Sequence, residues 1–491
     1  MTFGLEREIV DPAVYEKAVT HLKARGVHLP TINELSDPAK HLKSKAGDLA
    51  TVDPDTADPG NLFRVHWHND AERKGIDDVP AYMEIPQELT GVDAKIVVAL
   101  GNRFPMIHAH KVLAAYGCLV PRLMSGKFDP ETQRAVWPST GNYCRGGVAI
   151  SRILGCRSVA VLPEGMSAER FNWLEDWVTD PSDIVRTYGT ESNVKEIYDA
   201  CHELAKDPAN VILNQFSEFS NYIIHRAVTG PALLRIFEDL LNTHGNLTAR
   251  AFVSASGSAG TLAAGDHLKA VLGTDNCVVE ALECPTLLYN GFGEHNIQGI
   301  GDKHVPFIHN VMNTDYVIGV SDHATDGLNV VYNTTAGRSY LANRLGLGQE
   351  TLASLGNLGL SSLANILGAI KYAKYNKLGP SDVVLSVATD GAALYETELG
   401  LAEKKYFAGN ADEVTAAETF GRYLLGCTTD HMIELDRMGK ERIFNLGYYT
   451  WVEQQGVSVD EFVVRRDQKF WDGLMELVPA WDDMIQDFNA A

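Results

Sequence analysis

The chain has 491 residues, of which 45% are hydrophobic and 22% charged, as in a globular enzyme with one main domain and additions. Its formal net charge of −22 argues against nucleic acid or an anionic membrane as the main partner, although backbone amides can still hold a small anion. The seven cysteines form no CxxC pair, and neither a signal peptide nor an apolar run of bilayer length is visible, so we expect a soluble, cytoplasmic protein.

Residues 1–78 are polar and mixed, and we interpret them as an amino-terminal extension with a helix near residues 12–25. Within this extension, His66-Trp67-His68 suggests a metal site, because alternate residues of a strand share one face. No third ligand lies nearby in the sequence, so we predict that the chain holds no metal.

Strands and helices are expected to alternate between residues 79 and 400, and helices to form a carboxyl-terminal extension over 401–491. The alternation predicts an α/β fold with a mainly parallel sheet covered on both faces. We expect strands at 95–100, 134–137, 158–162, 211–213, 251–253, 277–281 and 383–388, and helices at 143–154, 192–206, 231–243, 262–272, 362–375 and 462–477.

Lys111 lies between the strand at 95–100 and a helix-like run that follows it. Open α/β sheets bind ligands at the carboxyl ends of their strands, where Lys111 is expected. An amine that is desolvated there can lose its proton and attack a carbonyl carbon. The alternative is an ordinary solvated lysine on the surface.

The segment Ser139-Thr140-Gly141-Asn142-Tyr143 falls between a predicted strand and a predicted helix. Its hydroxyls, amide and unpaired helix-start N–H groups could bind a carboxylate. The alternative is a helix N-cap, since Ser, Thr and Asn are common caps.

The segment 256–261, Ser-Gly-Ser-Ala-Gly-Thr, follows the strand at 251–253 and precedes a helix. Small residues let the backbone approach a ligand closely, and a helix amino end favours a phosphate. The glycine spacing fits neither a Walker loop nor a dinucleotide-binding turn. The alternative is a tight connection that needs small residues.

In this order, the lysine, STGN and GSAGT resemble the fold-type II pyridoxal-phosphate enzymes, which include cysteine synthase, cystathionine β-synthase, serine/threonine dehydratases and the tryptophan synthase β-chain. The resemblance covers about residues 79–400, and three further stretches are similar to the cysteine synthase branch: Asn214–Ser217 with Thr229–Pro231, Gly293–Gly301, and Gly359–Ser362. It implies two open, twisted, mainly parallel sheets covered by helices, with a smaller subdomain at roughly 115–230 inserted in the larger one. The helical extensions at 1–78 and 401–491 lie outside it.

The resemblance also implies roles for these residues. Lys111 would carry pyridoxal 5'-phosphate as a Schiff base and then remove the substrate Cα proton, while Asn142 would bind the cofactor's ring hydroxyl and Ser361 its pyridine nitrogen. His110-Lys111 looks like the AHK of the tryptophan synthase β-chain, so His110 would help to hold the phosphate; the alternative is a packed, internally bonded histidine. The other implied residues are Gly257, Ser258, Ala259, Gly260 and Thr261 for the phosphate, and Ser139, Thr140, Gly141, Tyr143 and Gln215 for the substrate.

The implied activity is β-elimination or β-replacement on cysteine, serine, O-acetylserine or a related amino acid, through an aminoacrylate intermediate and in a homodimer. One alternative is a serine/threonine-type ammonia-lyase, although its carboxyl-terminal part would be a βαββαβ regulatory domain rather than helices. The other is a non-catalytic scaffold that keeps the fold. The aromatic residues Phe470, Trp471 and Trp481 would form a subunit interface or anchor a helix on the core.

Overall fold

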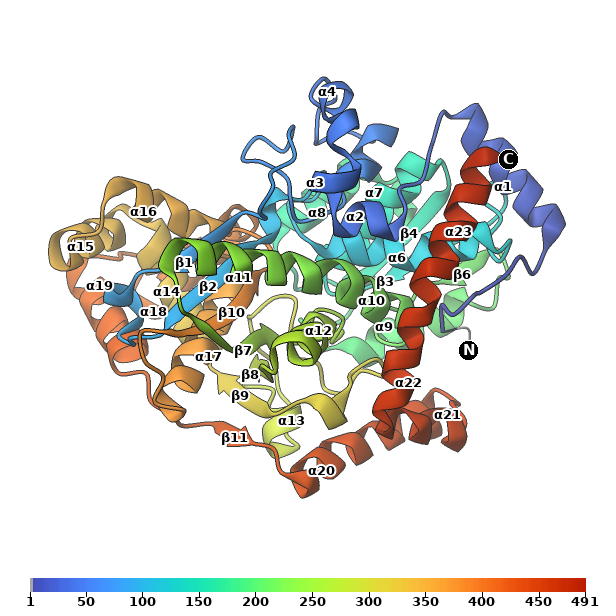
Figure 1. Cartoon of the computed structure of the whole chain (residues 1–491). Coiled ribbons are helices and arrows are strands. Elements are labelled where there is room, and N and C mark those ends of the chain that lie inside the picture. Colours follow the sequence, from blue (N-terminus) through green and yellow to red (C-terminus); the bar gives the residue numbers. More distant parts are fainter. Residues whose placement is uncertain (1–2) are drawn as a thin grey trace.

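Within residues 3–491, which the computed structural model describes, the strands form two β-sheets (Figure 1). In the larger sheet, β2, β10, β7, β8 and β9 run parallel and the edge strands β1 and β11 run antiparallel. The smaller sheet is wholly parallel. The larger sheet has the order β1 (Tyr82–Ile85), β2 (Lys95–Leu100), β10 (Asp382–Ala388), β7 (Thr248–Ala255), β8 (Asp275–Ala281), β9 (Tyr316–Val320), β11 (Met432–Glu434), and the smaller has β5 (Ile184–Thr187), β4 (Arg157–Pro163), β3 (Arg134–Pro138), β6 (Asn210–Ile212).

The two-sheet α/β fold is therefore confirmed, and each of the seven predicted strands lies in the structure within a few residues of its expected position. The strands of the smaller sheet lie within the subdomain range predicted at 115–230. Four short strands were not predicted: β1, β5, β9 and β11.

Helices fill the connections between the strands. Around the two sheets they are α5 (Gln87–Thr90), α6 (Lys111–Met124), α7 (Asn142–Leu154), α8 (Ala168–Trp177), α9 (Val194–Leu204), α10 (Phe219–Ile224), α11 (Gly230–His244), α12 (Leu262–Leu272), α13 (Thr286–Tyr289), α14 (Asp322–Asn333), α15 (Thr335–Leu345), α16 (Gln349–Ser354), α17 (Leu360–Tyr375) and α18 (Glu396–Tyr406). The ends of the chain add α1 (Pro12–Ala24), α2 (Ile32–Ser36), α3 (Pro38–His41), α4 (Ala46–Leu49), α19 (Glu413–Phe420), α20 (Arg437–Tyr448), α21 (Val459–Val463), α22 (Gln468–Gly473) and α23 (Leu477–Ala490). Among the described residues no single helix is long and apolar enough to cross a membrane; only the pair Gln349–Asn357 and Leu360–Tyr375, bent by 110°, meets both criteria together.

The central strands of the larger sheet are apolar on both faces. In β2, Val97 and Ala99 belong to one buried apolar cluster, whereas Ile96 and Val98 belong to the cluster on the opposite face. Parallel strands covered by helices on both sides have such continuous hydrophobic sequences. The parallel strands all end at one edge of the sheet, which is where the loops with polar residues emerge.

The amino-terminal segment contains a correction to the sequence interpretation. His66 and His68 are buried in a turn rather than on a strand, so they do not share a strand face. His66 Nδ1 accepts a hydrogen bond from the His68 backbone N–H at 3.1 Å. No group of three or more metal-ligating side chains is found across residues 3–491.

The carboxyl-terminal segment was predicted to be helical. It is built from helices except for the short strand β11, which pairs with β9 and extends the larger sheet. The helices of this segment pack on the core of the same chain. Trp471 and Trp481 are fully buried, and the Trp481 indole donates a hydrogen bond to the Glu6 carbonyl at 2.7 Å. Figure 1 shows α23, in red, running along the amino-terminal segment. Both tryptophans therefore anchor the tail within the chain.

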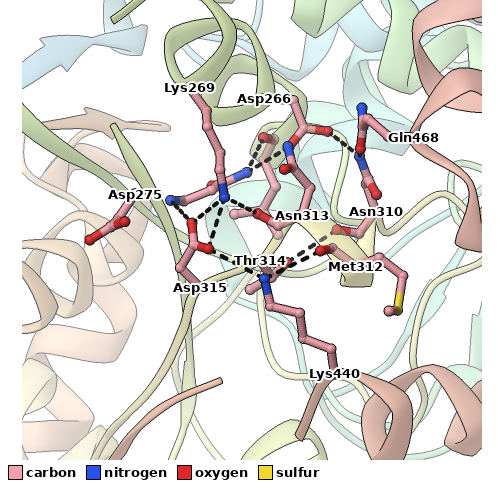
Figure 2. A network of polar contacts seen from close by, with 12 residues as sticks. Asp266, Lys269, Asp275, Asn310, Met312, Asn313, Thr314, Asp315, Lys440 and Gln468 are labelled. Atoms are coloured by element: carbon pink, nitrogen blue, oxygen red, sulfur yellow. Dashed lines mark hydrogen bonds and ion pairs between the residues drawn. The ribbon is translucent and has the colours of Figure 1, made fainter. Parts of the chain in front are cut away.

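A polar network fastens the tail to the larger sheet, as Figure 2 shows. Asp315, just before β9, accepts hydrogen bonds from Lys269 at 2.6 and 2.8 Å and from Lys440 of α20 at 3.4 Å. Nearby, the Asn310 amide donates to Asp266 at 2.8 Å and to Gln468 of α22 at 3.0 Å. The network joins the tail to α12, the helix that follows the turn at 257–261.

We expect the Trp481→Ala variant to lose about 3–5 kcal/mol of unfolding free energy, because it opens a large cavity under α23. Chemical denaturation followed by fluorescence measures this loss. The control is Tyr449→Ala, which removes an aromatic ring that is 65% exposed on the same tail and should change stability by less than about 0.5 kcal/mol. Equal effects of the two substitutions would contradict the anchoring role.

Candidate active site

Lys111 is the first residue of α6 and follows β2 after a ten-residue loop. In that loop Met106 and His108 adopt left-handed backbone conformations with φ of 64° and 50°, which non-glycine residues rarely do. The Lys111 side chain is half-buried, and its Nζ donates to Ser258 Oγ at 3.3 Å. Desolvation lowers the pKa of Lys111 to about 8, so a substantial fraction of the amine is neutral near physiological pH.

A cavity opens in front of this amine, lined by residues from the loops of both sheets. It brings together most of the predicted site residues, from five separate segments of the chain. Gly141, Gly260 and His110 are the predicted residues that do not line it. The lining residues are Lys111, Ser139, Thr140, Asn142, Tyr143, Gln215, Phe216, Ala255, Gly257, Ser258, Ala259, Thr261, Gln298, Gly299, Ile300, Asp302, Ser361 and Thr389.

The turn from Gly257 to Thr261, between β7 and α12, offers five backbone N–H groups, none of which donates to an acceptor within residues 3–491. Ala259 has a φ of 66°, which turns successive N–H groups toward one side. A Cβ at Gly257 would come within 2.5 Å of the Gly299 carbonyl, so this position has room only for glycine. Unpaired N–H groups just before an eleven-residue helix have the arrangement that binds phosphate in other proteins.

The start of α7 forms the second predicted cradle. Gly141, with φ of 147°, turns the chain into the helix, and its N–H donates to Ser139 Oγ at 3.0 Å. The Tyr143 hydroxyl donates to the Leu213 carbonyl at 3.1 Å, so Tyr143 offers its backbone N–H rather than its phenol to a ligand. The first N–H groups of α7 have no helical acceptors and suit a carboxylate.

His110 lies one hydrogen bond away from the cavity. Its Nε2 is 3.0 Å from Thr261 Oγ1, and its ring stacks on Trp67 and contacts His225 edge to face, at centroid distances of 5.4 and 5.2 Å. Burial lowers the pKa of His110 well below its usual value. The histidine is thus both packed and bonded to the phosphate turn, and any effect on a phosphate passes through Thr261.

Asn142 belongs to a buried charge cluster that joins the smaller sheet's helices to the larger sheet. Its Nδ2 donates to Asp390 Oδ2 at 2.6 Å, and its Oδ1 accepts from Arg145 at 3.0 Å. Arg170 lies 3.8 Å from the same carboxylate and donates to the Tyr395 hydroxyl, which itself donates to Asp390 at 2.9 Å. These contacts fix the orientation of the Asn142 amide and leave one of its two N–H bonds for a ligand.

Three polar residues that line the cavity were not predicted from the sequence, Gln298, Asp302 and Thr389, and neither was Glu191, which lies behind the cavity wall. Gln298 lines it, and its Oε1 accepts a hydrogen bond from Arg170. Asp302 lines it with a carboxyl group whose pKa is raised to about 8 by burial. Glu191 lies behind Thr140 and the Gly299 N–H, and burial raises its pKa to about 8 as well. Gln298 was within the matched segment 293–301, whereas Asp302 follows its last residue and Glu191 has no sequence signal.

The residues fit an aromatic aldehyde that carries a phosphate. The unpaired N–H groups of 257–261 suit the phosphate, and the Lys111 amine can reach a carbonyl carbon in the same cavity. At the other side, the Ser361 hydroxyl at the start of α17 forms no hydrogen bond with the described residues and faces the cavity.

Comparisons with known proteins agree with this geometry, although no protein-family model matches the chain. Cysteine synthase B of Campylobacter jejuni is 30% identical over 295 residues, which are 59% of this chain and 86% of that protein. Cystathionine beta-synthase of Saccharomyces cerevisiae is 26% identical over 285 residues, 56% of this chain and 52% of the yeast protein. Among solved structures, cysteine synthase from Entamoeba histolytica aligns with a TM-score of 0.54 and 20% identity, over 70% of this chain and 92% of that one.

We expect reductive labelling of Lys111 by a small aldehyde and cyanoborohydride to quicken about tenfold between pH 7 and 9 and then to level off, because the neutral amine reacts and its pKa is about 8. Peptide mass spectrometry at several pH values measures the rate. Lys206, whose side chain is exposed to solvent, serves as the control for the reagent itself. Parallel profiles for the two lysines would contradict the desolvated environment.

Asp390→Ala leaves two buried arginines without their carboxylate, so we expect a loss of about 3–5 kcal/mol in unfolding free energy. Asp390→Asn keeps the shape and one acceptor, and should lose distinctly less. Urea denaturation of both variants provides the comparison, and similar losses would show that the charge at position 390 is unimportant.

Proposed function

Because this chain belongs to the cysteine synthase family of fold-type II pyridoxal-phosphate enzymes, we propose that it catalyses β-replacement or β-elimination on a small L-amino acid such as cysteine, serine or O-acetylserine. One observation carries the proposal: a half-buried amine, a turn with unpaired backbone N–H groups and the start of helix α7 line a single cavity. Relatives named cysteine synthase match the chain over most of their own length.

Lys111 is proposed to hold the cofactor covalently and to move the substrate Cα proton. When bound, pyridoxal phosphate supplies an electron sink for the electron pair released at Cα. The desolvated Nζ accepts that proton, since a lowered pKa keeps the amine neutral between turnovers. Ser258 Oγ, 3.3 Å from Nζ, orients the amine and shares the same turn as the phosphate site.

The remaining residues are proposed to bind and orient. The N–H groups of 257–261 hold the phosphate, and Thr261 is itself held by His110. The backbone at Ser139–Tyr143 and Gln215 hold the substrate carboxylate, while Asn142 donates its free N–H to the ring hydroxyl. Ser361 offers a neutral hydroxyl to the pyridine nitrogen, which leaves that nitrogen unprotonated and favours quick loss of a β-substituent.

The two alternative functions have less support. An ammonia-lyase of the dehydratase type would carry a βαββαβ regulatory domain, whereas 401–491 contains helices and the single short strand β11 among its described elements. A scaffold without activity would have no need of the lysine and the unpaired turn, and both are present. The homodimer and the cytoplasmic location remain predictions from the sequence.

The purified protein with added cofactor should be yellow, and borohydride should bleach the band while labelling Lys111. Lys111→Ala should lose both the band and all activity, whereas Lys206→Ala, on the surface, should keep them. Incubation with L-cysteine, L-serine or O-acetyl-L-serine, with and without sulfide, followed by assays of pyruvate, ammonia, sulfide and cysteine, separates elimination from replacement. A colourless, inactive wild-type protein would support the scaffold instead.

A further inference from the structure

Asp302 has a buried carboxyl group that lines the cavity and has no hydrogen-bond partner within residues 3–491. The residue is only 7% exposed, it lines the cavity, and Oδ2 is fully enclosed with no donor in reach. Across residues 3–491 no lysine, arginine or histidine lies within 4.0 Å of either oxygen. Burying a carboxyl in this way is unfavourable unless a ligand completes its hydrogen bonding.

Backbone contacts hold Asp302 in place at the wall of the cavity. Its carbonyl accepts a hydrogen bond from Thr286 Oγ1 at 2.8 Å, and Gly299 and Gly301 before it have positive φ of 98° and 79°. Two other buried polar atoms at the cavity, Gln215 Oε1 and Gln298 Nε2, also have no hydrogen-bond partner in the part of the chain that the structure describes. The cavity wall therefore has side-chain atoms without hydrogen-bond partners among the described residues, in addition to the backbone N–H groups at 257–261 and at the start of α7.

Glu191 is a second buried carboxyl group, and its surroundings differ from those of Asp302. One of its oxygens accepts the Gly299 N–H, and Glu191 does not line the cavity. Asp302 makes no such structural bond, and the charged group that most affects it is Lys111. A carboxyl group that lines the same cavity as the Lys111 amine, and whose Oδ2 has no donor within residues 3–491, is placed for proton transfer.

We propose that Asp302 is the catalytic acid–base that serves the β-substituent, and that the chain accordingly acts on amino acids with a free β-hydroxyl or β-thiol, a conclusion that rests on the function proposed above. The substrate class is thereby narrowed to L-serine or L-cysteine, in preference to an O-acylated serine.

In elimination, Lys111 Nζ takes the Cα proton, the freed electron pair forms the Cα–Cβ double bond, and the bond from Cβ to sulfur or oxygen breaks. The leaving atom departs with the bonding pair and takes the Asp302 proton, giving hydrogen sulfide or water and a carboxylate. In replacement, an incoming thiol gives its proton to that carboxylate as its sulfur bonds Cβ, and Nζ returns a proton to Cα.

The need for an acid separates the substrate classes. Acetate is a stable anion, because a carboxylic acid has a pKa of about 4, and it can leave without a proton. Hydroxide leaves poorly unless it is protonated, because its conjugate acid, water, has a pKa of about 15.7, and an acid likewise lets the sulfur leave as neutral hydrogen sulfide rather than as an anion. Burial raises the pKa of Asp302 to about 8, which keeps its proton in place at neutral pH.

The test compares kcat/KM of the wild-type holoenzyme and Asp302→Asn on L-serine, L-cysteine and O-acetyl-L-serine. We expect a loss of about 100-fold or more on serine and cysteine and less than about fivefold on O-acetylserine, as for loss of a general acid. Equal losses on all three would overturn the role of Asp302 while leaving the proposed function standing. No turnover of any of the three by the wild-type would instead refute the proposed function.

A binding measurement adds a readout that does not depend on turnover. L-Alanine has no β-heteroatom, so its affinity for the holoenzyme, read from the change in cofactor absorbance, should be the same for wild-type and Asp302→Asn. A variant that binds L-alanine about tenfold more weakly would show that Asp302 holds the α-amino or α-carboxylate group, which overturns the proposal.

The wild-type alone provides a third test that does not require the variant to fold. The ratio of kcat/KM on serine to that on O-acetylserine should fall as pH rises through about 8, because the acid then loses its proton. The titration of Lys111 is common to both substrates and cancels in the ratio. The other titratable groups that interact with Asp302 are Glu191, Tyr198 and Cys284. A ratio independent of pH would contradict the proposal.

Discussion

Desolvation of the Lys111 amine is the constraint around which the molecule is built. Withdrawing an ammonium group from water costs several kcal/mol, so the amine tends to shed its proton instead. The fold maintains this state from several sides: β2 and α6 position the residue, the small-residue turn after β7 faces it, and Ser258 accepts its hydrogen bond. The turn at 257–261 has backbone N–H groups without acceptors among the described residues. An anionic cofactor would provide these acceptors.

The strands that could be predicted are those whose own sequence shows that they are buried. The strands at 95–100 and 383–388 are continuous apolar runs, which buried parallel strands require, and both were found from the sequence. The edge strands β1 and β11 have three or four residues and partly exposed side chains, so their pairing depends on the neighbour rather than on their own composition. β9 is apolar but follows a long irregular segment that has no periodicity.

The site residues likewise divide into those with a local sequence pattern and those that only the folded structure brings together. Lys111, the Ser139–Tyr143 turn and the 257–261 turn each combine a strand end with a helix start, which is visible locally. Asp390 and Asn142 are 248 positions apart, and their contact exists only once the two sheets meet. Asp302 has no pattern of its own, because a single acidic residue is ordinarily a solvated one. Its importance comes from burial, which only the three-dimensional arrangement determines.

The indole of Trp481 bonded to the Glu6 carbonyl has a consequence for how the chain is made. Glu6 and Trp481 are 475 positions apart, so during synthesis the segment around Glu6 is made long before its partner helix α23. Contacts of such sequence separation close late and slowly. The two sheets around the cavity can therefore assemble first, and the contact between α23 and the amino-terminal segment forms only after residues 477–490 have been made.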